Sequence, residues 1–99
     1  MTMTTAPVSV VVPCYRCVAT LERAVLSVVR QTQRPLELIL VDDASGDGTL
    51  DLLQTLQTRY GVWVRVVALP ANAGAASARN AGWNVATQPY IAFLDADDA

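Results

Sequence analysis

The sequence predicts a single α/β domain built on a parallel sheet. Four short apolar runs have the character of strands, and the three segments between them repeat apolar residues at helical spacing. This alternation, with short connections, favours parallel strands joined by right-handed crossovers. A chain of 99 residues, 53% of them hydrophobic, can bury one modest core and leaves no room for a second domain.

The first strand and the first helix are expected before residue 35. Residues 8–12 form a β-branched run that Pro13 ends, which is typical of a strand buried on both faces. Apolar residues then recur at helical spacing over 21–29, with Thr20 as a candidate cap. Pro35 is expected to stop that segment, because the residue before a proline avoids helical geometry.

The second strand and helix flank a loop rich in Asp, Ser and Gly. Residues 36–41 predict a buried strand, and residues 42–49 form the loop. Leucines at helical spacing over 50–60, an acidic first turn and Gly61 at the end predict the second helix.

The last three elements follow in the same order. Residues 62–67 alternate with period two at their start, which predicts a strand nearer an edge of the sheet, ended by Pro70. Residues 72–74 lead into a third helix that Pro89 ends, and residues 90–94 predict a fourth strand. One stripe of the third helix consists of small residues suited to close packing on a sheet: Ala75, Ala78, Gly82 and Val85.

The composition excludes several chemistries. The chain has no Lys and no His, so a His base, a His-ligated metal, a Lys Schiff base and a Lys-containing phosphate loop are all excluded. A net charge of −2 with scattered arginines disfavours nucleic-acid binding. No stretch has the features of a signal peptide or a membrane span, so a cytoplasmic location is expected, with membrane association open if the chain belongs to a longer protein.

Acidic residues gather where the strands are expected to end. Ligands of parallel α/β sheets bind outside the carboxyl ends of the strands. Five of the seven aspartates follow predicted strands there: Asp42, Asp43, Asp95, Asp97 and Asp98.

The last three of these aspartates suggest a metal site. Carboxylates this close repel one another unless a cation lies between them, and oxygen ligands without His favour Mg²⁺ or Mn²⁺. A solvated acidic turn remains the alternative. Asp42 and Asp43 can accept hydrogen bonds from a ligand, or serve only the local turn. Two other sites in which a strand ends in acids, those of P-loop enzymes and phospho-receiver domains, are disfavoured because both use a lysine.

Three further residue types near this edge each allow two interpretations. Cys14 and Cys17 could form a redox pair, although incidental cysteines are favoured over this. Tyr15 could stack on a planar base or simply pack. Arg79, in a segment nearly all Ala and Gly, could bind phosphate or a carboxylate, or be solvated.

Taken together, the chain resembles the amino-terminal half of a family 2 glycosyltransferase. Five blocks carry the resemblance, in family order: VSVVVPCY at 8–15, LERAVLSVVRQT at 21–32, LELILVDDASGDGT at 36–49, NAGAASARNAG at 72–82 and YIAFLDADD at 90–98. The resemblance implies a GT-A fold, of which this chain would supply the Rossmann-like β-α-β-α-β-α-β half. It also implies transfer of a hexosyl-type sugar from a nucleotide diphosphate to an acceptor hydroxyl.

The resemblance also implies roles for particular residues. Pro13 and Tyr15 would line the pocket of the nucleotide base, and Asp43 would accept a hydrogen bond from the base. Arg79 would contact the nucleotide. Asp95 would face the ribose or the water shell of a Mn²⁺ or Mg²⁺ ion, and Asp97 would ligate that ion.

The chain departs from the family pattern in two respects. Arg16 stands where the family commonly has Asn, and the family's catalytic base is expected beyond Ala99. We therefore expect a flexible N-terminus over residues 1–7 and a nucleotide-sugar-binding half over residues 8–99 that ends just after the DxD motif. The alternative is a non-catalytic module that pairs with itself or another chain through an open sheet edge.

Overall fold

Strands and helices alternate along the chain in the predicted order. The structure is a computed structural model that describes residues 4–15, 18–30, 33–44, 46 and 48–94. Its elements are β1 (Thr4–Cys14), α1 (Val18–Val29), β2 (Gln33–Asp42), α2 (Thr49–Tyr60), β3 (Val64–Ala68), α3 (Ala75–Val85) and β4 (Tyr90–Phe93).

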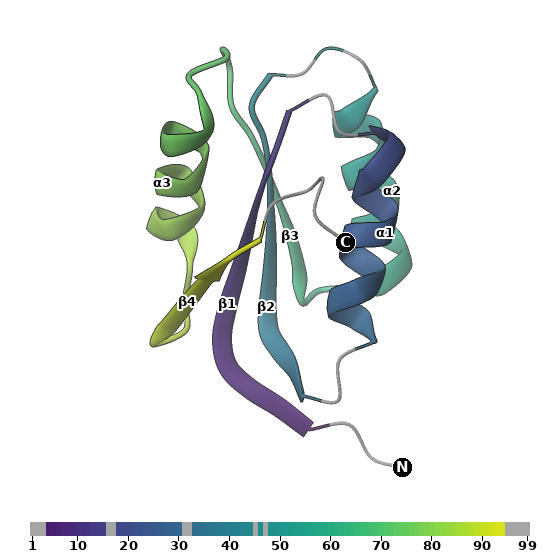
Figure 1. The fold of residues 1–99 in the computed structure, drawn as a ribbon, viewed down its shortest axis with the longest axis vertical. Coiled ribbons are helices and arrows are strands. Elements are labelled where there is room, and N and C mark those ends of the chain that lie inside the picture. Colours follow the sequence, from purple (N-terminus) through teal and green to yellow (C-terminus); the bar gives the residue numbers. More distant parts are fainter. Residues whose placement is uncertain (1–3, 16–17, 31–32, 45, 47, 95–99) are drawn as a thin grey trace.

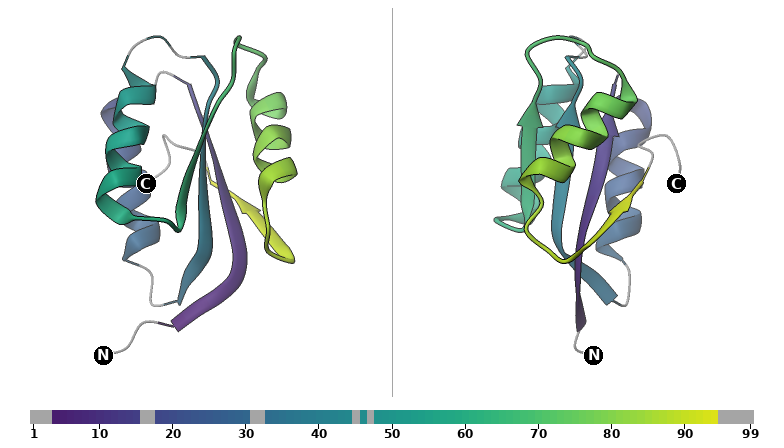
Figure 2. Two further views of the ribbon diagram at one scale, coloured as in Figure 1. Left: turned by 180° about the vertical axis from the view of Figure 1, so that it is seen from behind. Right: turned by 90° about the vertical axis from the view of Figure 1, so that its left-hand side faces the viewer.

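The four strands form one parallel sheet between two layers of helix. Their order is β3-β2-β1-β4, so β3 lies at an edge, as its alternating pattern predicted. Helices α1 and α2 cover one face and α3 covers the other (Figure 1). The two further views show the same three layers (Figure 2). The predicted α/β class is confirmed.

Two strands are longer than the sequence patterns predict. β1 begins at Thr4, within the segment assigned to a flexible N-terminus, because residues 4–6 pair with the start of β2. Pro35 lies inside β2, opposite Ala6, and does not merely follow a helix. The register shifts between Ala6 and Ser9, so the missing N–H of the proline falls where the ladder is already irregular.

The sheet buries a hydrophobic cluster on each face. The larger cluster joins the sheet to α1 and α2 and includes Leu21, Leu40 and Leu53, all fully buried. The smaller one lies under α3 and includes Val11 and Ala78. The small-residue stripe of α3 makes this second contact close.

Two members of that stripe, Ala78 and Gly82, are buried, whereas Ala75 is exposed. A Cβ placed on Gly82 would lie 2.3 Å from Cγ1 of Val11. Glycine therefore fits this position because the helix backbone approaches the sheet too closely for any side chain. This approach fixes where α3 lies over β1.

A buried carboxylate connects four segments beside the starts of β3 and β4. One oxygen of Glu37 accepts hydrogen bonds from the Ser9 hydroxyl at 2.8 Å, the Thr87 N–H at 3.0 Å and the Thr87 hydroxyl at 3.2 Å. Its other oxygen lies 3.3 Å from Nη1 of Arg65, which also donates to the Val85 carbonyl at 2.7 Å. This network ties the end of α3 to the sheet.

Candidate functional site

The carboxyl ends of β1, β2 and β3 form one continuous edge of the sheet. The Asp43 N–H donates to the Cys14 carbonyl at 2.9 Å, and the Leu69 N–H donates to the Asp42 carbonyl at 2.9 Å. These bonds continue the ladder one residue past the strands. They bring Asp42 and Asp43 to the edge at the top of Figure 1, as the sequence predicted.

The Asp43 carboxylate is bound to the segment that leads into α3. Its Oδ1 accepts the Ala73 N–H at 2.9 Å, and its Oδ2 accepts the Gly74 N–H at 2.9 Å and the Asn72 side-chain amide at 3.2 Å. The Asn72 amide also lies 3.1 Å from the Asp43 carbonyl oxygen. The residue is only 3% exposed, so these contacts replace the water that the charge loses on burial.

Helix α3 begins at the point where this segment ends. Gly74 precedes the helix with a φ of 94°, a conformation that favours glycine, and its carbonyl accepts the Ala78 N–H at 3.0 Å. Arg79 directly follows Ala78 and is exposed.

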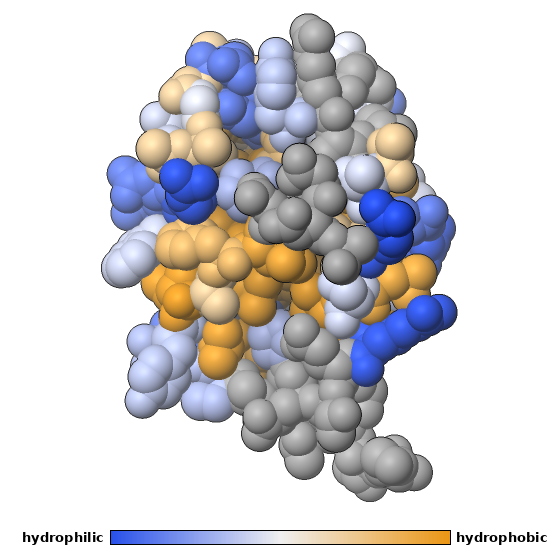
Figure 3. Space-filling view, viewed as in Figure 1, coloured by the Kyte–Doolittle hydropathy of each residue, from blue (hydrophilic) through white to orange (hydrophobic). Residues whose placement is uncertain are grey.

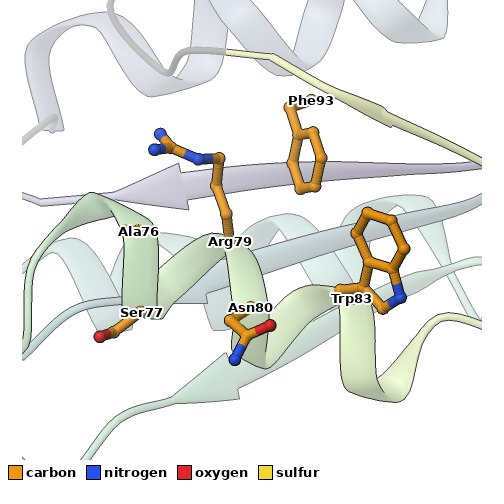
Figure 4. A pocket seen from close by; sticks show the side chains of 6 residues that line it. All are labelled: Ala76, Ser77, Arg79, Asn80, Trp83 and Phe93. Carbon is orange, nitrogen blue, oxygen red and sulfur yellow. The ribbon is translucent and has the colours of Figure 1, made fainter.

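A pocket lies between α3 and β4, with a volume of about 410 Å³. Arg79 and Trp83 extend from α3 toward the side of β4, and the guanidinium of Arg79 points along β1 toward its carboxyl end (Figure 4). The rings of Trp83 and Phe93 stack with centroids 6.2 Å apart. The lining residues are Ala76, Ser77, Arg79, Asn80, Trp83 and Phe93.

The residues at the end of β1 differ in exposure. Tyr15 follows the strand and is 47% exposed, whereas Pro13 is half-buried within it. Cys14 is fully buried between them, and its thiol donates to the Val12 carbonyl. Such burial does not suit a redox thiol, which must be reached by its partner. Cys17 lies outside the described residues.

The predicted metal residues Asp95 and Asp97 also lie outside the described residues, as does Asp98. Within the described ranges, no group of three or more His, Cys, Asp or Glu side chains lies close enough to hold a metal ion. The structure brings together Asp43 and the segment before α3, and Arg79 lies within that helix, while Pro13 and Tyr15 lie on the neighbouring strand end.

Sequence reasoning did not identify two parts of this site. Asn72 binds Asp43 in the structure, and Trp83 and Phe93 form the stacked wall of the pocket. An Asn followed two residues later by Gly, directly before a helix, is a signal that could have pointed to Asn72. Nothing in the sequence pairs Trp83 with Phe93.

Exposed aromatic side chains continue from the pocket along β4. Viewed as in Figure 1, hydrophobic residues gather over β4 and the adjoining side of α3 (Figure 3). Trp83 is 56% exposed, Tyr90 66% and Phe93 43%. In the part of the chain that the structure describes, β4 pairs only with β1.

None of the helices described is both long and apolar enough to cross a bilayer.

Comparison with protein families and curated proteins yields consistent matches. The family model described as Glycosyl transferase family 2 matches residues 9–99. TuaG of Bacillus subtilis (strain 168), whose name assigns it provisionally as a teichuronic acid biosynthesis glycosyltransferase, is 44% identical over 91 residues. These residues make up 92% of this chain and 36% of TuaG. The UDP-Glc:alpha-D-GlcNAc-diphosphoundecaprenol beta-1,3-glucosyltransferase WfaP of Escherichia coli is 37% identical over 93 residues, or 92% of this chain and 35% of WfaP. The chain thus spans about a third of the length of these relatives.

Solved structures give the same result for the fold. TarS of Staphylococcus aureus (residues 1–349) in complex with UDP has a TM-score of 0.79 and 28% identity, over 91% of this chain and 27% of TarS. The mannosyltransferase PcManGT of Pyrobaculum calidifontis, in complex with GDP-Man and Mn²⁺, has a TM-score of 0.81 and 27% identity, over 92% of this chain and 27% of PcManGT. The predicted similarity to GT-A glycosyltransferases is confirmed.

Proposed function

Since the chain belongs to glycosyltransferase family 2, we propose that it binds a nucleotide-diphosphate sugar for transfer of the sugar to an acceptor hydroxyl. The observation that carries the proposal is the arrangement at the carboxyl edge of the sheet, where Asp43 binds the segment before α3 and the guanidinium of Arg79 points toward this edge (Figure 4). Ligands of parallel α/β sheets bind at this edge. The similar structures TarS and PcManGT bind UDP and GDP-Man.

The proposed roles follow the positions of the described residues. Tyr15 exposes its ring at the end of β1, where with Pro13 it would line the pocket of the base. Oδ1 of Asp43 accepts one hydrogen bond from the described residues, which leaves a lone pair for an N–H of the base. Arg79 carries a full positive charge at neutral pH and would contact the nucleotide.

The proposal includes a divalent cation held by Asp97, with Asp95 facing the ribose or the water shell of the cation. Carboxylates without His or Cys partners fit Mn²⁺ or Mg²⁺, and PcManGT was solved with Mn²⁺. When bound, such a cation neutralises the charge of the leaving diphosphate. The chain's own part is to supply the carboxylates and, through Arg79, a second positive charge.

The complete reaction needs groups that this chain is not expected to supply. The chain spans about a third of its curated relatives, and the resemblance places the base that deprotonates the acceptor beyond Ala99. We propose that these 99 residues bind the donor without transferring its sugar. The low cysteine count favours the cytoplasmic location included in this proposal.

We expect the chain to bind UDP more tightly in the presence of Mn²⁺, and Asp97→Ala to remove that dependence. The substitution should lower the affinity for UDP with Mn²⁺ at least about tenfold, because a metal ligand is lost. Titration calorimetry with and without Mn²⁺ measures both effects. Asp51→Ala, at an exposed position of α2, is the control and should bind like the unsubstituted chain. Equal binding by the unsubstituted chain and Asp97→Ala would refute the metal role.

A second candidate function is association through β4, which the exposed aromatic residues there favour. The outer edge of a strand offers unpaired N–H and C=O groups to another strand, and β4 carries no charged side chain that would oppose pairing. The partner would be a second copy of this chain or the remainder of a longer protein.

If β4 mediates self-association, the chain should sediment as a dimer at high concentration. Phe93→Lys should shift it toward the monomer, because a charge on an edge strand opposes pairing. Val62→Lys is the matched control, since Val62 is fully exposed at a distance from β4 and should leave the dimer intact. A monomer at the highest concentration measured would exclude self-association.

A further inference from the structure

The Asp43 carboxylate binds the segment between β3 and α3 through several hydrogen bonds, none of which involves a ligand. Its two oxygens accept three hydrogen bonds from residues 72–74, and two of these come from successive backbone N–H groups. The carboxylate is buried, and charge-assisted bonds of this kind are about twice as strong as those between neutral groups.

The anchored segment determines where α3 starts. The Gly74 N–H donates to Asp43 and the Gly74 carbonyl accepts the Ala78 N–H, so this one residue joins the edge of β2 to the first turn of the helix. Arg79 directly follows Ala78 in the helix. At the other end of α3, Gly82 sits directly on Val11. The helix is therefore fixed at two points, one of which is a carboxylate of the proposed site.

We infer that Asp43 is a positioning residue for Arg79: by holding the N–H groups of Ala73 and Gly74, it fixes the first turn of α3 so that the guanidinium faces the nucleotide. This inference rests on the proposed function for the identity of the ligand. It adds a role to Asp43 beside any contact with the base, and that role exists before a nucleotide binds.

The anchoring is tested first without ligand. In Asp43→Asn, one acceptor oxygen becomes an NH₂ group that faces an N–H donor, so the Ala73 and Gly74 amides should exchange with solvent about tenfold faster or more. Exchange is measured by NMR, and amides in the middle of β1 and β2 should not change. Asp51→Asn, an exposed carboxylate on α2, is the matched control. Unchanged exchange at Ala73 and Gly74 would overturn the inference.

The positioning of Arg79 is tested by a double-mutant cycle. The dissociation constant for UDP with Mn²⁺ is measured for the unsubstituted chain, Asp43→Asn, Arg79→Ala and the double variant. If Asp43 acts through Arg79, Asp43→Asn should weaken UDP binding by a smaller factor in the Arg79→Ala background than in the unsubstituted chain. If the factors by which the two single substitutions weaken binding simply multiply in the double variant, Asp43 does not act through Arg79 and the inference is overturned, even if exchange at the amides has increased.

Comparing GDP with UDP distinguishes a contact of Asp43 with the base from the positioning of Arg79. If Asp43→Asn displaces Arg79, it should weaken the binding of GDP and of UDP by a similar factor. Loss of a contact to one base would instead change the ratio of the two dissociation constants. A changed ratio without coupling to Arg79 would overturn the inference. Absence of UDP and GDP binding by the unsubstituted chain would contradict the proposed function, while the exchange rates still decide the anchoring.

Discussion

Replacing Glu37 with alanine is expected to lower the free energy of unfolding by about 3 kcal/mol, because buried donors lose their acceptor. The Ser9 hydroxyl is fully buried, and the Thr87 N–H also depends on this carboxylate. Urea denaturation at neutral pH measures the loss. Glu22→Ala is the control: the ion pair of Glu22 with Arg59 is about half exposed on both sides, so its removal should change stability far less.

The same carboxylate predicts how stability depends on pH. Burial alone would raise the pKa of Glu37, but hydrogen bonds from the Thr87 N–H, Ser9, Arg65 and the Thr87 hydroxyl together lower the pKa below 4.5. A lowered folded-state pKa stabilises the fold above about pH 4.5, and this contribution is lost as the pH falls through the folded-state pKa. Glu37→Gln should flatten that decline. Identical acid-denaturation profiles for Glu37→Gln and the unsubstituted chain would contradict the role assigned to the charge.

Replacing Gly82 with alanine should destabilise the fold by about 2 kcal/mol, although alanine is the better helix former. The new Cβ would lie 2.3 Å from Cγ1 of Val11, which is fully buried and cannot swing into solvent. Helix α3 or β1 must therefore shift. Thermal and urea denaturation measure the net loss.

The steric explanation for Gly82 can be separated from a general effect on the helix. Asn84→Ala changes an exposed position of α3 and should be neutral or slightly stabilising. Val11→Ala alone should lower the free energy of unfolding. The double variant with Gly82→Ala should be little less stable than Val11→Ala, because the two changes exchange volume at one contact. Simple addition of the two losses would show that the clash is not the cause.

The alternation of strand-like and helical segments along the chain predicted the fold, because strands and helices depend mostly on neighbouring residues. The runs around Val10 and Leu38, and the stripe with Ala78 and Gly82, carry that information locally. Asp42 and Asp43 could be placed at one edge because parallel strands share a direction. The start of β1 and the place of Pro35 could not be predicted, since both depend on pairing across the sheet.

The partners of charged residues were harder to predict. Glu37 reads as a single polar residue in an apolar strand, and its partners Ser9 and Thr87 lie on other segments. Asp43 was predicted as a ligand-binding acid, whereas its bonds to residues 72–74 appear only once β2 and the start of α3 are placed side by side. The folded chain decides which acid meets which donor.

The position of β4 has a consequence for the order of assembly. Val10 pairs with Leu38 on one side and with Ala92 on the other, so the second pairing closes a much longer loop than the first. Loop closure costs more entropy as the loop lengthens, and β4 contributes only four residues in return. We therefore expect the three strands β1, β2 and β3 to form before β4, which becomes the last strand to join the sheet and the first to leave it.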